Sequence, residues 1–268
     1  MKYKLLLLDI DGTLRPDGCE RIPRENAEAV NAVQRLGVKI AIATGRGRTG
    51  VGKGLLRSIR PDYWVCAGGA QLQDSKGNDL ALHRLTNEEM YALVDFFEDY
   101  ELPLRFTFHD ANYAYIGYEE FVAREKAKNL HNHIVDGEDQ DHHLVEMPFG
   151  AFGFVPRERA AQFAEKYGYL GLQFLYSYPG SDGCDILEAE VDKGRGLCEL
   201  AGLVGLDPAD CVAVGDGDND AAMLRAAGLG IAMANGSEAA KAAADRIGPD
   251  ATPFGVAELC RSLWPEAF

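Results

Sequence analysis

A run of apolar residues near the start of the chain ends in two aspartates that are separated by one residue. The run is Tyr3–Leu8 (YKLLLL), and Asp9-Ile10-Asp11 follows it directly. Such a run is typical of a strand that is buried on both faces of a parallel sheet. Residues i and i+2 of an extended chain point to the same side, so Asp9 and Asp11 are expected to converge at the carboxyl end of this strand. Two carboxylates this close repel each other, and a hard divalent cation with oxygen ligands would neutralise them.

Predicted strands and helices alternate on both sides of a middle segment. Before it we expect a helix over residues 23–36, a strand over Val38–Ala43, a helix through Leu55 and Leu56, and a strand over Tyr63–Cys66. After it we expect a helix that begins at Asp192, a strand over Cys211–Val214, a helix over residues 219–227, and a strand over Leu229–Met233. This alternation predicts parallel strands with right-handed crossovers, and thus an α/β fold with a Rossmann-like, doubly wound sheet.

The middle segment has a different rhythm, because predicted strands there follow one another. Residues 70–82 and 104–116 each read as a hairpin, and Thr86-Asn87-Glu88-Glu89 is a capping box that opens a helix. Further helices are expected near residues 119–129 and over residues 157–167. The segment therefore reads as an inserted α+β domain with antiparallel pairing. We expect a core domain over residues 1–84 and 188–268, and an inserted cap domain over residues 85–187.

The charge of the chain argues against a polyanionic partner. The formal net charge is −15, and the segment from Leu85 to Leu187 holds 19 acidic and 7 basic residues. Nucleic acids bind through Lys and Arg that neutralise phosphates, so we expect no nucleic-acid partner. Six cysteines lack any CxxC pair, and the first apolar run is too short for a signal peptide or a membrane span. These features predict a cytoplasmic protein that does not bind a membrane.

Four polar clusters fall where a doubly wound sheet would bring them together. Three of the clusters follow apolar strands and one opens a helix. They are Asp9 with Asp11, Thr44-Gly45-Arg46, Asp192-Lys193-Gly194, and Gly215-Asp216-Gly217-Asp218-Asn219-Asp220. Each has an ordinary explanation when taken singly, as a helix cap, a surface lysine or a solvated loop. Their joint occurrence at these boundaries favours one functional site.

These residues resemble the motifs of a known family. DIDGT at 9–13, ATGR at 43–46, DKG at 192–194 and GDGDND at 215–220 are similar to the four motifs of the haloacid dehalogenase (HAD) superfamily of phosphatases. The insertion between the second and third motifs resembles the type II cap of the Cof-like (IIB) branch. The resemblance implies a Mg2+-dependent phosphatase of small phosphorylated metabolites, such as sugar phosphates or similar phosphomonoesters, with an aspartyl-phosphate intermediate.

The same resemblance implies roles for individual residues. Asp9 would be the nucleophile, and Asp11 would act as general acid and then as general base. Mg2+ would be held by Asp9, by the backbone carbonyl of Asp11 and by Asp216, with support from Asp220 and Asn219.

The phosphoryl oxygens would be bound by Thr44 and Lys193, with help from the Gly45 amide and Arg46, so that charge in the transition state meets fixed donors. Asn219 is a further candidate for substrate binding. Asp218 matches no fixed position of the motif.

Two nucleotide-binding patterns overlap the second cluster. Gly45, Gly47 and Gly50 spell GxGxxG, and residues 47–54 are one residue short of a Walker A loop. The residue after Lys53 is Gly54, which lacks the hydroxyl that a Walker A loop places on magnesium. No acid ends the next predicted strand to bind a ribose. These glycines are therefore expected to form a turn.

Two alternative functions stay open at this point. The protein is also compatible with a phosphotransferase or mutase of the same fold, or with a receiver-like module that carries an aspartyl phosphate. The histidines at 131, 133, 142 and 143 are expected to lie in an exposed, solvated loop rather than at a zinc site. The protein is expected to be a monomer or a weak dimer.

Overall fold

The chain divides into two compact units. The computed structural model describes residues 2–52, 54–128 and 133–268. The first unit consists of Met1–Thr44, Lys53–Ala81 and Asp192–Phe268, and the second consists of Gly45–Gly52 and Leu82–Val191. The loop Gly45–Gly52, which the predicted domain division assigns to the core, thus groups with the inserted segment. The boundaries at residues 84 and 188 stay a prediction.

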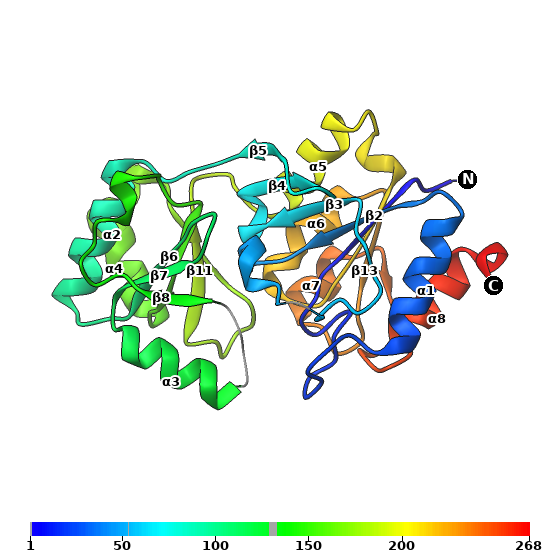
Figure 1. Cartoon of the computed structure of the whole chain (residues 1–268), viewed down its shortest axis with the longest axis horizontal. Helices are drawn as coiled ribbons and strands as arrows, with labels where there is room; N and C mark the ends of the chain where they lie inside the picture. The colour runs from blue at the N-terminus through cyan, green and yellow to red at the C-terminus, as the bar shows by residue number, and fades with distance from the viewer. Residues whose placement is uncertain (1, 53, 129–132) are drawn as a thin grey trace. The chain divides into compact units, whose positions relative to one another are not determined.

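The first unit is built on an eight-stranded sheet (Figure 1). The spatial order is β14-β13-β12-β1-β2-β3-β4-β5, and the strands from β14 to β3 run parallel while β4 is antiparallel to β3. The strands are β1 (Leu5–Leu8), β2 (Lys39–Ala43), β3 (Tyr63–Cys66), β4 (Gln71–Asp74), β5 (Asp79–Leu82), β12 (Cys211–Gly215), β13 (Leu229–Ala232) and β14 (Arg246–Ile247). The predicted α/β fold is confirmed.

The register of the central strands aligns the polar clusters. Leu8 at the end of β1 pairs with Val214 of β12 and with Ile42 of β2. The residues that follow the three strands therefore emerge at one edge of the sheet. All four residues of β1 are buried, as expected for a strand that is covered on both faces.

Helices cover both faces of this sheet (Figure 1). Leu5 and Leu7 of β1 share a core cluster with Leu197 and Leu200 of α5 and with residues of α6, whereas α1 contacts β2 and packs against α8. The helices of the first unit are α1 (Arg24–Arg35), α5 (Lys193–Leu203), α6 (Ala221–Ala226), α7 (Glu238–Ala243) and α8 (Gly255–Leu263).

One predicted helix of the core is wrong. Residues 54–58 form turns instead of the helix expected through Leu55 and Leu56, with bonds from Arg57 N to Gly54 O and from Ile59 N to Leu56 O. Gly54 has φ +87° and Arg57 has φ +50°, and left-handed backbone at these positions breaks a right-handed helix. Lys53, the lysine of the Walker-like pattern, lies outside the described residues.

The second unit contains a six-stranded sheet with the order β10-β11-β9-β6-β7-β8. All its pairings are antiparallel except that of β7 with β8. The strands are β6 (Leu104–Thr107), β7 (Asn112–Ile116), β8 (Ile134–Asp136), β9 (Gly150–Phe154), β10 (Gln173–Tyr176) and β11 (Gly183–Leu187). The helices are α2 (Asn87–Asp99), α3 (Tyr118–Lys128) and α4 (Arg157–Tyr167).

The capping box predicted at Thr86 is confirmed. Glu89 N donates to Thr86 Oγ1 at 3.2 Å, and Thr86 N donates to Glu89 Oε2 at 2.7 Å. These two bonds satisfy donors that a helix N-terminus otherwise leaves unpaired, so α2 begins where the sequence places it.

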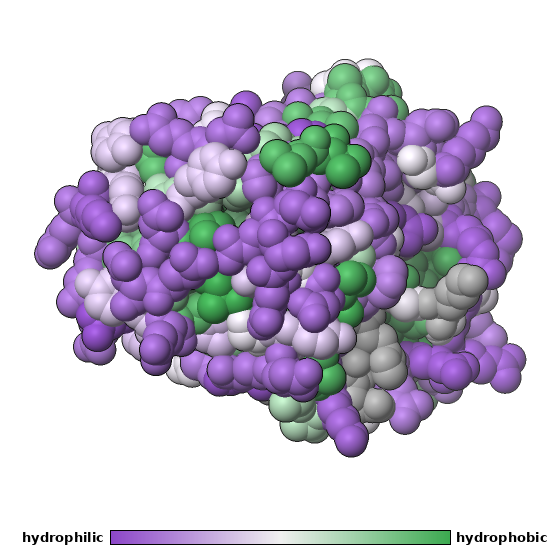
Figure 2. All heavy atoms as spheres, turned by 60° about the vertical axis from the view of Figure 1, so that its left-hand side comes forward, coloured by the Kyte–Doolittle hydropathy of each residue, from purple (hydrophilic) through white to green (hydrophobic). Residues whose placement is uncertain are grey.

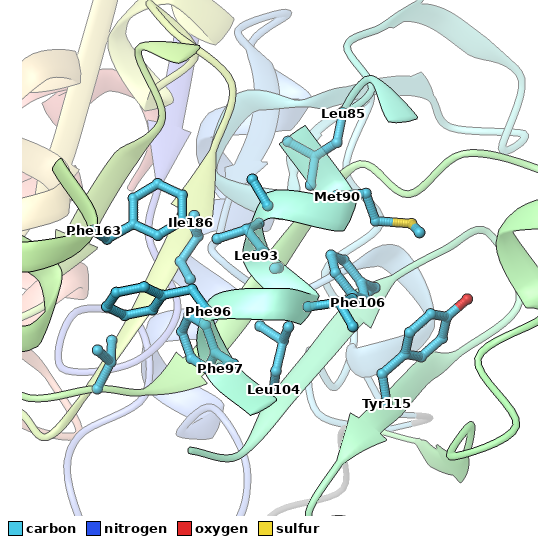
Figure 3. Close-up of a cluster of buried hydrophobic side chains, with 14 of the residues drawn as sticks. Leu85, Met90, Leu93, Phe96, Phe97, Leu104, Phe106, Tyr115, Phe163 and Ile186 are labelled. Atoms are coloured by element: carbon cyan, nitrogen blue, oxygen red, sulfur yellow. The ribbon is translucent and has the colours of Figure 1, made fainter. Parts of the chain in front are cut away.

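An aromatic core joins α2 and α4 to the second sheet (Figure 3). Met90, Leu93 and Phe97 of α2 pack in one cluster with Phe106 of β6 and Ile186 of β11. A buried cluster of this kind supplies the main driving force for folding of the unit.

The exposed loop predicted over residues 131–143 is only partly correct. His131 and Asn132 lie outside the described residues. Ile134–Asp136 forms β8, because its β-branched pair aligns beside β7.

Hydrophilic residues predominate on the face drawn in Figure 2. Among the described ranges, no helix combines the length and the apolar composition of a membrane span.

One-turn 3-10 segments complete the secondary structure. The segment Asp218–Asp220 belongs to the fourth polar cluster, and the segment Arg48–Gly50 closely follows the second cluster. The segments are η1 (Arg48–Gly50), η2 (Ala67–Gly69), η3 (His142–Leu144), η4 (Gly168–Leu170), η5 (Pro208–Asp210), η6 (Asp218–Asp220) and η7 (Pro265–Ala267).

Candidate active site

Four predicted site residues meet at the carboxyl edge of the first sheet. Asp9 follows β1 and its amide donates to Val214 O at 3.0 Å, which ties it to β12. Asp216 follows β12, and Asp220 ends η6. Lys193 is the first residue of α5, where the side chain of Asp192 accepts from Arg195 N and caps the helix.

Lys193 holds two of these carboxylates. Its ammonium group donates to Asp9 Oδ1 at 2.7 Å and to Asp220 Oδ1 at 2.6 Å, and its side chain is only 2% exposed. Burial disfavours the charged ammonium, but Asp220 and Asp9 outweigh it and raise the pKa of Lys193 above its usual range. Lys193 is therefore a fixed positive charge beside Asp9.

Asp220 connects this lysine to the loop after β12. While its Oδ1 accepts from Lys193, its Oδ2 accepts from the amides of Asp216 and Gly217 at 2.9 Å each. Both oxygens thus have donors, so Asp220 orients Lys193 and Asp216 together.

Asp216 is fixed by residues of the first loop. Thr13 Oγ1 donates to Asp216 Oδ1 at 2.6 Å, and Asn235 Nδ2 donates to Gly12 O at 2.9 Å. A Cβ at Gly12 would lie 2.2 Å from Asp216 Oδ2, and Gly12 has φ +83°. Glycine is therefore required at position 12 both for its backbone and for the space it leaves to the carboxylate.

The charges of this group fit a divalent cation. Oxygens of Asp9, Asp216 and Asp220 all lie within 4.8 Å of one another. Burial raises the pKa of Asp9 well above its ordinary value, with Lys193 opposing and Asp220 adding to the rise. Burial and the neighbouring Asp220 raise the pKa of Asp216 to about 7. Three carboxylates share the charge of one lysine, and oxygen ligands of this kind suit a hard ion.

Asp11, the second aspartate of the motif, has a separate partner. Arg15 Nε donates to Asp11 Oδ1 at 2.8 Å, and Arg15 Nη2 donates to the same oxygen. The sequence analysis did not identify Arg15, although a basic residue four positions after an acid is a recognisable pattern for an ion pair. Thr13 lies within the DIDGT motif, whereas no local sequence pattern indicates a role for Asn235.

The remaining predicted residues are placed as follows. Thr44 is buried after β2, where its amide donates to Val65 O and its carbonyl accepts from Gly68 N. Asn219 lies in η6 between Asp218 and Asp220. Gly45 and Arg46 group with the second unit, in which Arg46 Nη1 donates to Gly50 O at 3.2 Å. A contribution of these residues to the site stays a prediction.

A second group with metal-ligand chemistry lies in the inserted unit. Ligand atoms of Asp110, His142 and Glu146 lie within 4.8 Å of one another. The predicted solvation of His142 is wrong, because its side chain is only 19% exposed and its ring stacks on Tyr113 at 3.9 Å between centroids. Glu146 here already accepts from Arg84 Nη2 at 3.0 Å, so a guanidinium balances its charge.

The fold and the site define a haloacid dehalogenase-like hydrolase. The model of that family matches residues 6–259, and the chain belongs to it. A solved structure of a sugar phosphatase of HAD subclass IIB superposes with a TM-score of 0.86 at 24% identity, over 97% of this chain and 99% of that chain. The predicted family, including its Cof-like type, is confirmed.

Relatives by sequence carry phosphatase names. YxeH of Bacillus subtilis is 29% identical over 87% of this chain and 88% of its own length. The phosphoglycolate phosphatase of Methanopyrus kandleri is 50% identical over 116 residues, which are 42% of this chain and 47% of that protein. The family match shows that the chain is an enzyme, a hydrolase of the HAD type, and both of these relatives are named as phosphatases.

Proposed function

We propose that the protein is a Mg2+-dependent phosphatase that hydrolyses small phosphorylated metabolites, sugar phosphates or similar phosphomonoesters, through an aspartyl phosphate. The observation that carries the proposal is the buried group in which Lys193 bonds Asp9 and Asp220 while Asp216 lies alongside. A carboxylate that is fixed, buried and adjacent to a permanent cation suits a nucleophile for phosphorus.

Asp9, Asp216 and the backbone carbonyl of Asp11 would hold Mg2+, with Asn219 nearby. The bound ion would neutralise negative charge so that a phosphate dianion can approach a carboxylate. Asp220 supports the ion indirectly, since both of its oxygens already accept hydrogen bonds.

The reaction proceeds in two steps. An oxygen of Asp9 attacks phosphorus, the bond from phosphorus to the leaving oxygen breaks, and Asp11 gives that oxygen a proton. Asp11 then takes a proton from water, which attacks phosphorus and releases phosphate from Asp9. Lys193 and Thr44, together with the Gly45 amide and Arg46, bind the phosphoryl oxygens.

Incubation with p-nitrophenyl phosphate and Mg2+ tests this proposal. We expect steady release of nitrophenol, and an acid-quenched sample should contain a phosphate adduct on the peptide that holds Asp9. Asp9→Asn should reduce turnover to below a few per cent of wild type. A single stoichiometric burst would indicate the receiver-like module instead, and turnover by Asp9→Asn near the wild-type rate would reject the nucleophile.

A panel of phosphorylated metabolites, assayed with and without a second sugar phosphate as acceptor, identifies the substrate class. Release of inorganic phosphate without an acceptor supports hydrolysis, whereas phosphate appearing only on the acceptor supports a transferase or mutase.

We further propose a cytoplasmic protein that binds no nucleic acid, because the net charge is −15 and all six cysteines are free thiols.

A further inference from the structure

Arg15 makes an ion pair with Asp11 that is more firmly built than a surface pair. Two nitrogens of its guanidinium, Nε and Nη2, donate to Asp11 Oδ1, and the third, Nη1, donates to Cys19 O at 3.1 Å. The Arg15 side chain is 19% exposed and that of Asp11 is 41% exposed. The arginine is thus the anchored partner, and the carboxylate is the more accessible one.

The backbone around the pair is fixed as well. Arg15 N donates to Ile10 O at 2.7 Å, and Gly12 N donates to Arg15 O at 2.9 Å. Gly12 in turn is bound through its carbonyl by Asn235. The loop that carries Asp11 is therefore closed on itself, and Arg15 is held at both its backbone and its guanidinium.

The physical consequence concerns the carboxyl group of Asp11. An exposed aspartate samples several rotamers, whereas a planar guanidinium with fixed donors selects one arrangement. A proton donor loses efficiency when it is displaced by about 1 Å, for which losses on the order of 100-fold are known.

We infer that Arg15 is a positioning residue, which holds the carboxyl group of Asp11 in place for proton transfer to the leaving oxygen. The inference rests on the proposed function, because it takes Asp11 as the acid and base. Arg15 itself touches no reacting atom in this role, and it acts only through Asp11.

Arg15→Gln tests the inference through two substrates. For an alkyl phosphate, whose leaving oxygen needs a proton, we expect kcat/KM to fall roughly 10- to 100-fold. For p-nitrophenyl phosphate, whose leaving group departs without a proton, kcat/KM should change less than about threefold. Arg15→Lys, which keeps the charge but not the fork, should lose an intermediate amount for the alkyl phosphate.

A matched control is available in α1. Arg24 Nε donates to Glu28 Oε1 at 2.6 Å with the same spacing of four residues, but both side chains are exposed. Arg24→Gln should leave both substrates at wild-type kcat/KM. Equal losses for the two substrates in Arg15→Gln would overturn the inference, since they would indicate an effect on the fold or on phosphate binding.

A double-mutant cycle separates this inference from the proposed function. In an Asp11→Asn background, Arg15→Gln should cause no further loss beyond about twofold, because the two residues act as a unit. A full additional loss would overturn the positioning role. If Asp11→Asn itself retains wild-type kcat/KM for the alkyl phosphate, the acid–base assignment fails; if it loses activity and Arg15→Gln does not, only the positioning role fails.

Discussion

The ammonium group of Lys193 lies 2.7 Å from Asp9 Oδ1, with both side chains buried. A buried ion pair gains little net free energy over an apolar pair, but the loss of one partner leaves an uncompensated charge. Lys193 is therefore expected to be essential to the folded state as well as to activity.

Lys193→Met should lower the free energy of unfolding by about 3–5 kcal/mol in metal-free buffer and should abolish turnover. Urea denaturation measures the change. Lys39→Met is the control, because Lys39 pairs with Asp62 at the surface at 2.9 Å and should contribute at most about 1 kcal/mol. Equal losses in the two variants would contradict the importance of the buried pair.

Gly12→Ala should reduce both stability and activity. The added Cβ would lie 2.2 Å from Asp216 Oδ2, in addition to the strain of φ +83°. Gly18→Ala is a matched control, since Gly18 has φ +78° with nothing within 4 Å of the added atom. Both variants should lose roughly 1 kcal/mol from backbone strain. Only Gly12→Ala should also lose most of its turnover, and similar kinetics of the two variants would count against the contact with Asp216.

Mg2+ should stabilise the protein against unfolding. An ion that binds only the folded state adds about 2.7 kcal/mol at a concentration 100 times its dissociation constant. Asp216→Asn replaces one of the proposed carboxylate ligands with an uncharged amide and should weaken this stabilisation strongly. Thermal unfolding at increasing Mg2+ concentration measures the effect. A wild-type midpoint that does not move with Mg2+ would argue against a metal at these carboxylates.

The free energy of unfolding of the metal-free protein should fall as the pH rises toward and through about 7. Burial and the nearby Asp220 raise the pKa of Asp216 to about 7 in the folded protein, whereas an unfolded aspartate titrates near 3.9. This raised pKa stabilises the folded state fully at a pH below the pKa of the unfolded aspartate. The stabilisation is lost as the pH rises through the pKa of the folded state.

Asp216→Asn should flatten this pH dependence. Denaturation midpoints between about pH 4 and pH 8 compare the variant with the wild type in the presence of a chelator. Addition of Mg2+ to the wild type should also offset the loss at high pH, since the ion favours the ionised carboxylates. Parallel pH profiles for wild type and variant would refute the assignment of the slope to Asp216.

The sequence by itself determined the features that depend on short stretches of chain. The apolar run before Asp9 predicted β1 and the edge at which the site lies, and Thr86 with Glu89 predicted the start of α2. The motifs identified the family. The helix through Leu55 and Leu56 failed, because local apolar spacing carries no information on the left-handed backbone at Gly54 and Arg57.

Only the tertiary structure decided which groups touch. Lys193 and Asp9 are 184 positions apart, and Thr13 and Asp216 are 203 positions apart. Whether Lys193 bonds Asp220 as well as Asp9, and whether Asn235 reaches the carbonyl of Gly12, depends on the packing of helices and loops around the sheet. The pKa shifts of Asp9 and Asp216 likewise arise from burial, which no single stretch of sequence sets.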